Sequence, residues 1–143
     1  MKKKTIIKLL VIVAVLVIAK LIFNPYARIS RYVERNQGNL MQSCEFYLKN
    51  GVSDDSYSGI KIDGIFGDAN KIVQFYFSGK GLVPSSTYYG FYYSPADVPV
   101  PYVNADYELT KKGDNKWNWE GEGDNGGIIR KICDNWYYYE AWF

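Results

Sequence analysis

Histidine is absent from this chain of 143 residues, and cysteine and methionine occur only twice each. Without histidine there is no Ser-His-Asp or Cys-His nucleophilic system and no metal site that needs an imidazole ligand. The sequence also contains no P-loop and no G-x-S-x-G motif. The catalytic chemistry left open is that of paired carboxylates, as in glycoside hydrolysis.

Acidic residues are common enough to supply carboxylate pairs by chance, so this signal has little weight. The candidates are Asp97, Asp106, Glu108, Glu120 and Glu140. We therefore expect a protein that is not an enzyme and that uses no cofactor.

A basic domain surface is also missing. All 15 acidic residues but only 12 of the 17 basic residues follow position 23, which gives that part of the chain a net charge of −3. Nucleic-acid-binding domains usually carry a basic face. We therefore expect no nucleic-acid partner.

The sequence has one long apolar run. After the basic start MKKK, residues 5–23 are apolar except for Thr5, Lys8 and Lys20. Nineteen helical residues span roughly 28 Å, about the thickness of the hydrocarbon core of a bilayer. The run predicts a transmembrane signal anchor at residues 1–23.

A cleaved signal peptide is the alternative interpretation of the same run. Its best cleavage site, Val17-Ile18-Ala19, is followed by Lys20 and three more apolar residues, a poor start for a mature chain. Lysines at the N-terminus favour a cytoplasmic N-terminus, although Arg28, Arg31 and Arg35 beyond the run oppose it. We expect a single-pass protein of the cell membrane with an extracytoplasmic domain at residues 24–143.

The two cysteines, Cys44 and Cys133, form an even pair. In an exported domain such a pair predicts a disulfide bond. Two buried free thiols are the alternative.

One long helix is expected directly after the anchor. Asn24-Pro25 is typical of a helix start, and Asn50-Gly51 is typical of a helix end. Between them Ile29, Val33, Leu40, Cys44 and Leu48 recur on one stripe. The pattern predicts an amphipathic helix over residues 25–49.

Beyond residue 53 the helical pattern gives way to β-branched and aromatic residues separated by turn residues. The expected strands are 59–66, 71–78, 87–93, 106–111, 116–122, 127–133 and 136–142, with an irregular proline-rich stretch at 94–103. Asp134-Asn135 suits a two-residue hairpin. The predicted fold is α+β, with the long helix packed on an antiparallel, tyrosine-rich sheet.

The stretch KWNWEGEGDNGG (residues 116–127) is a hairpin candidate that also holds rings and acids. Alternation places Trp117 and Trp119 on one strand face, which predicts that Trp117 is buried, and the acids on the other. Glu120, Glu122 and Asp124 are a weak calcium candidate, because they do not match the EF-hand spacing. No metal is expected.

Fourteen tyrosines are the most unusual feature of the composition. The stretches TYYGFYY and NWYYYEAWF place aromatic rings on both faces of their strands, which suits either a core or a binding surface. The candidate surface comprises Tyr88, Tyr89, Phe91, Tyr92, Tyr93, Trp136, Tyr138 and Trp142. Its expected partner is an envelope protein, with cell-wall glycan as the alternative.

Two resemblances follow from these residues. The apolar start, Pro25 and YVERNQ (32–37) resemble type IV pilins, in which an apolar helix with an internal proline leads into a sheet domain closed by a disulfide. The pilin peptidase site, a glycine before Phe or Met with a glutamate five residues later, is missing, and Lys8 stands near that glutamate's place. This difference argues against pilin processing and filament assembly.

The second resemblance covers most of the chain after the anchor. YYGFYYSPADVPVPY and GEGDNGGIIRKICDNWYYYEAWF are similar to uncharacterised small membrane-anchored extracytoplasmic proteins of Gram-positive bacteria. It implies a location at the cell envelope. The sequence as a whole predicts a membrane-anchored binding module, with a pilin-like subunit, a wall-glycan binder or a carboxylate-based glycan hydrolase as alternatives.

Overall fold

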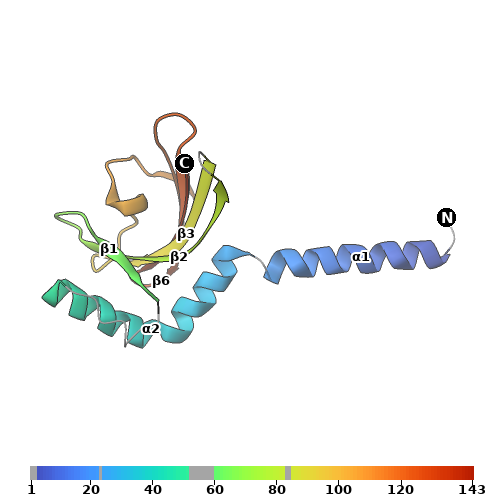
Figure 1. Ribbon diagram of the computed structural model, residues 1–143, viewed down its shortest axis with the longest axis horizontal. Coiled ribbons are helices and arrows are strands. Elements are labelled where there is room, and N and C mark those ends of the chain that lie inside the picture. Colours follow the sequence, from blue (N-terminus) through green and yellow to red (C-terminus); the bar gives the residue numbers. More distant parts are fainter. Residues whose placement is uncertain (1–2, 23, 52–59, 83–84) are drawn as a thin grey trace.

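Two α-helices precede a seven-stranded sheet in the computed structural model, which describes residues 3–22, 24–51, 60–82 and 85–143 (Figure 1). The elements are α1 (Lys3–Ile22), α2 (Pro25–Asn50), β1 (Ile62–Phe66), β2 (Ile72–Leu82), β3 (Ser85–Tyr93), the 3-10 turn η1 (Tyr102–Asn104), β4 (Thr110–Gly113), β5 (Lys116–Glu120), β6 (Gly126–Cys133) and β7 (Trp136–Trp142). The predicted α+β class is confirmed.

Helix α1 projects away from the rest of the molecule, and α2 runs beneath the sheet (Figure 1). The predicted helical run is therefore present. Within the described residues, no helix combines the length and the apolar content that crossing a membrane requires.

The ends of α2 lie where the capping residues predict. The Asn24 side chain accepts hydrogen bonds from the backbone N–H groups of Tyr26 at 3.0 Å and Ala27 at 3.5 Å, and Pro25 occupies the first turn. Gly51 closes the helix at φ 70°, with its N–H donating to the Tyr47 carbonyl at 2.8 Å. These contacts satisfy backbone groups that a helix end leaves unpaired.

The sheet has the order β1-β2-β3-β7-β6-β5-β4, and every neighbouring pair is antiparallel. Cys133 pairs with Trp136, so Asp134-Asn135 forms the predicted two-residue hairpin, with Asn135 at φ 68°. Residues 106–109, expected in a strand, instead lie in the segment that leads to β4. Strand β2 continues four residues past its predicted end because Gly79–Leu82 pair with β3. The predicted strand start at residue 59 lies outside the described residues.

Both faces of the sheet are covered. On one face Phe75, Phe91 and Trp136 pack against Ile29 and Val33 of α2. On the other, Tyr92, Trp119, Tyr137 and Tyr139 pack against Val98, Val100, Tyr102 and Leu109 of the segment between β3 and β4. Alternating residues of β3 and β7 therefore enter two different cores. This explains why aromatic rings occur at consecutive positions in both strands.

Candidate functional site

Most of the predicted aromatic surface is core. Tyr89, Phe91, Tyr92, Trp136 and Tyr138 are buried, whereas Tyr88, Tyr93 and Trp142 are half-buried. The prediction of a continuous binding surface along residues 88–93 is therefore wrong. The physical reason is that both faces of the sheet are covered: α2 buries Tyr89, Phe91, Trp136 and Tyr138 on one face, and the segment between β3 and β4 buries Tyr92 on the other.

The tryptophans of β5 share a face as expected, since both join the second core. Trp119 is fully buried and stacks on Tyr107 at 4.8 Å between ring centroids. Trp117 is only half-buried, so the prediction of its burial is wrong. It lies next to the short edge strand β4, where less structure covers it.

The cysteines are free thiols in the structure, so the predicted disulfide is not present. Cys44 is buried and its thiol lies in the field of Glu45, whereas the Cys133 thiol lies in that of Glu34. These glutamates are 11 residues apart on α2, about 16 Å along the helix axis. Cys44 lies on α2 itself, whereas Cys133 is the last residue of β6. Burial raises the pKa of both thiols, and the nearby glutamates raise it further.

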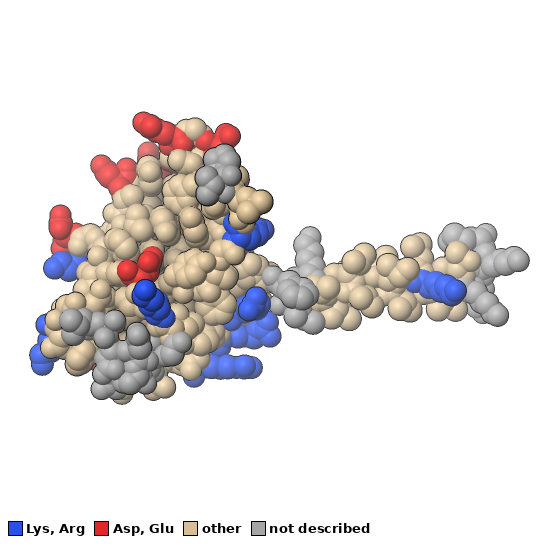
Figure 2. Space-filling view, viewed as in Figure 1, with Lys and Arg blue, Asp and Glu red and all other residues tan. Residues whose placement is uncertain are grey.

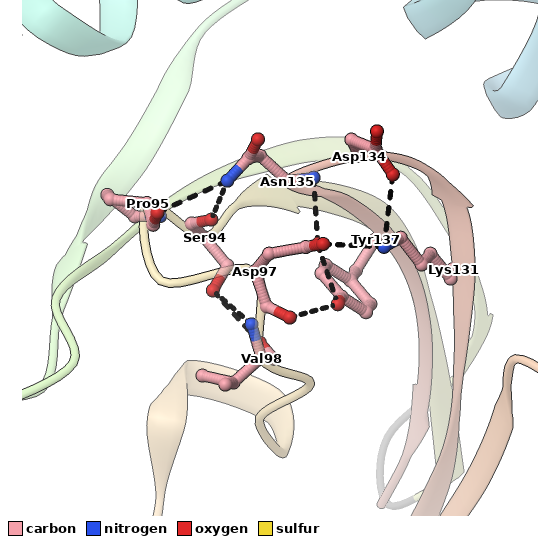
Figure 3. A network of polar contacts seen from close by, with 8 residues as sticks. All are labelled: Ser94, Pro95, Asp97, Val98, Lys131, Asp134, Asn135 and Tyr137. Atoms are coloured by element: carbon pink, nitrogen blue, oxygen red, sulfur yellow. Dashed lines mark hydrogen bonds and ion pairs between the residues drawn. The ribbon is translucent and has the colours of Figure 1, made fainter.

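Among the candidate carboxylates, Asp97 lies at the centre of a network of polar contacts (Figure 3). Its carboxylate accepts hydrogen bonds from Lys131 Nζ at 2.6 Å and from the Asn135 N–H at 2.9 Å, and lies 3.0 Å from the Tyr137 hydroxyl. Partial burial raises the pKa of Asp97, but these hydrogen bonds outweigh it and hold the pKa below its usual value. Ser94 joins the network by accepting from the Asn135 side chain.

This network fastens the segment after β3 to the β6–β7 hairpin, which is a structural role. Asp106, Glu108 and Glu120 are exposed and Glu140 is half-buried. Within the described residues no group of three or more acids or cysteines is placed to hold a metal ion, and this includes Glu120, Glu122 and Asp124.

A polar pocket of about 370 Å³ lies where the start of α2 meets the sheet. The guanidinium of Arg130 lies over the Tyr26 ring at 4.9 Å, and that ring packs edge-on against Tyr138 at 5.3 Å. The Tyr138 hydroxyl donates to Glu140 Oε2 at 3.2 Å. Burial, and then the negative charge of Glu140, raises the pKa of Tyr138, so its phenol stays protonated as a donor.

A second pocket lies farther along α2, lined by Arg28, Arg31, Tyr32, Arg35, Asn36 and Phe77. In Figure 2 basic side chains gather on the end of the domain beside α1, and acidic side chains lie mostly at the far margins. The sequence contains the three arginines at helical spacing, but Phe77 comes from β2. From the sequence, these arginines bear only on the membrane orientation of the anchor, and the pocket is not predicted.

Three exposed aromatic residues and two half-buried ones form what we call the aromatic band, which comprises Tyr76, Tyr88, Tyr102, Tyr107 and Phe143. Successive rings pack against one another. The ring centroids lie 6.4 Å apart for Tyr76 and Tyr88, 6.5 Å for Tyr88 and Tyr102, and 5.6 Å for Tyr102 and Phe143. Trp119 links Phe143 to Tyr107. Tyr76 is 46% exposed, and Tyr107 and Phe143 are each 37% exposed. The band lies on the side of the sheet opposite α2.

Comparison with known proteins gives no match: no family model, no curated protein and no solved structure is significantly similar to this chain. The candidate sites therefore rest on their own geometry.

Proposed function

We propose that the chain is a membrane-anchored binding module, with α1 embedded in a bilayer and the α+β domain outside the cytoplasm. The observation that carries this proposal is the surface of α1. Every side chain from Thr5 to Ile18 is exposed, and the large apolar ones among them are 40–64% exposed. So much apolar surface is unfavourable in water and favourable in lipid.

The charge at the start of the chain supports the same arrangement. Lysines precede the apolar run in the sequence, which favours a cytoplasmic N-terminus.

The domain acts by binding rather than by catalysis in this proposal. The chain has no histidine, and its best-connected carboxylate, Asp97, holds two segments together. The aromatic band is the proposed contact surface for an envelope protein. Tyrosines combine apolar area with a hydroxyl that stays hydrated, and such residues are enriched at the centres of protein interfaces.

Cell fractionation tests the anchor. The full chain is expected to stay in the membrane pellet after an alkaline carbonate wash. The double variant Val13→Asp/Leu16→Asp should move to the supernatant, because each central acid disfavours insertion by about 3 kcal/mol. Val13→Leu/Leu16→Val is the matched apolar control and should stay in the pellet. A wild-type chain found in the soluble fraction would contradict the anchor.

Crosslinking in intact cells tests the binding surface. With an N-terminal tag, the full chain should capture one dominant envelope protein, and Tyr76→Ser/Tyr107→Ser should lose it. Met41→Ser, which changes an exposed apolar residue on α2, should retain it. Ladders of self-crosslinked chains would favour a pilin-like subunit instead. Capture of glycan without protein would favour the wall-glycan alternative.

A further inference from the structure

The pocket on α2 is built from a stripe of guanidinium groups over an aromatic floor. Arg28, Arg31 and Arg35 stand at positions i, i+3 and i+7, which share one helix face. Beneath them the Tyr32 ring packs edge-on against Phe77 at 5.9 Å. The pocket encloses about 320 Å³, the size of a small-ligand site.

Only part of the hydrogen-bonding capacity of the arginines is used by the protein itself. Arg31 Nε donates to the Ala27 carbonyl at 2.9 Å, and the Arg28 guanidinium lies 5.7 Å from the centre of the Phe77 ring. Both ion pairs found in the described residues belong to Lys131. Within the described residues, these three exposed arginines thus form no ion pair with a carboxylate.

The stripe also lies close to the proposed bilayer surface. Helix α1 ends at Ile22 and α2 begins at Pro25, so Arg28 and Arg31 fall in the first two turns after the anchor. Figure 2 shows basic side chains gathered beside the base of α1. A guanidinium donates two parallel hydrogen bonds to a phosphate, and this geometry favours arginine over lysine for phosphate recognition.

We propose that Arg28, Arg31 and Arg35 bind the phosphodiester headgroup of an anionic phospholipid in the membrane that holds α1. The inference rests on the proposed anchoring, because the bilayer then presents its headgroups at the height of the stripe. Asn36 and Tyr32 complete the pocket wall. By the positive-inside rule, few arginines are expected on the exported side of the anchor. Headgroup binding would account for the three arginines found there.

Native mass spectrometry of the full chain in a neutral detergent tests this site. Phosphatidylglycerol and phosphatidylcholine with identical acyl chains are added in equal amounts, so contacts of the chains with α1 cancel. The wild type is expected to retain phosphatidylglycerol preferentially. Each guanidinium loses charge-assisted hydrogen bonds to the headgroup that are worth roughly tenfold in affinity, so Arg28→Gln/Arg31→Gln/Arg35→Gln should reduce the preference on the order of 100-fold or more.

The matched control, Lys61→Gln/Lys71→Gln/Lys112→Gln, removes the same charge from exposed positions and should keep the wild-type preference. Equal retention of both lipids by the wild type, or loss of preference in the control, would overturn the headgroup site while leaving the anchor intact. Full competition by soluble glycerophosphoglycerol at the same concentration would show that the site binds a free phosphodiester rather than a lipid of the bilayer. Failure of the anchor would appear separately, as a soluble wild-type chain in the carbonate wash.

Discussion

The phenol of Tyr92 makes two hydrogen bonds to a single residue, Val100. Its oxygen accepts from the Val100 N–H at 2.8 Å and its hydroxyl donates to the Val100 carbonyl at 3.1 Å. Tyr92 lies in β3, and both residues are buried. One side chain thus pairs both backbone groups of Val100, a residue of the segment that covers the second face of the sheet.

We predict that Tyr92→Phe lowers the free energy of unfolding by about 2 kcal/mol. The variant keeps the ring but leaves a buried N–H and a buried carbonyl without their partner, and each such loss costs about 1–3 kcal/mol. Urea unfolding of the full chain in a mild detergent measures the change. Tyr88→Phe, at a half-buried position in the same strand, should be nearly neutral.

Two glycine substitutions should have opposite effects. At Gly90 a Cβ would collide with the Phe75 carbonyl and the Tyr139 ring, so Gly90→Ala should destabilise by several kcal/mol. At Gly38, inside α2, a Cβ meets nothing within 4 Å, so Gly38→Ala should stabilise by about 0.8–1 kcal/mol. Thermal unfolding of both variants compares them, and destabilisation by Gly38→Ala would show that the helix needs glycine there.

The stability of the protein should fall in acid partly through Asp97. Its pKa is lower in the folded chain than the unfolded value of about 3.9, because Lys131, Asn135 and Tyr137 donate to it. The contribution is therefore present above the unfolded pKa and lost as the pH falls through the lower, folded pKa.

Unfolding free energies between pH 6 and pH 2 measure this contribution. Asp97→Asn should flatten the profile below pH 4. Asp134→Asn is the matched control, since Asp134 is highly exposed and 3.3 Å from the same lysine, and it should keep the wild-type slope. Parallel profiles for wild type and Asp97→Asn would show that Asp97 does not contribute.

Thiol titration should find two free thiols per denatured chain without reductant. In the folded protein both should react slowly with a disulfide reagent near pH 8, because burial raises their pKa and the thiolate is the reactive form. Half-buried Cys133 should react before Cys44, and Cys133→Ser should remove the faster phase. Fewer than two thiols in the denatured chain would indicate a disulfide.

Local signals predicted the elements well because their causes are local. Asn24-Pro25 starts α2 and Gly51 ends it through contacts with neighbouring residues of the chain. Asp134-Asn135 likewise forms the turn between two consecutive strands, β6 and β7. The alternation in β3 and β7 was visible too. The sequence did not show whether the second face of these strands is buried. The reason is that the burial of Tyr92 depends on Val100, which belongs to an irregular segment.

The candidate pockets were harder to predict because each joins residues distant in the chain. Tyr26 and Arg130 meet through packing of α2 on β6, and Arg28 meets Phe77 through its packing on β2. The arginine stripe itself is visible in the sequence. Only the structure gives it an aromatic floor.

The position of β7 has a consequence for how the chain can fold during synthesis. This strand lies between β3 and β6, so β1–β3 and β4–β6 are joined in the sheet only through it. A nascent chain whose residues 136–142 are still inside the ribosome can form at most two separate three-stranded meanders. The two cores share strand β7, so neither is complete until it emerges. Assembly of the domain therefore waits for its last strand to be translated.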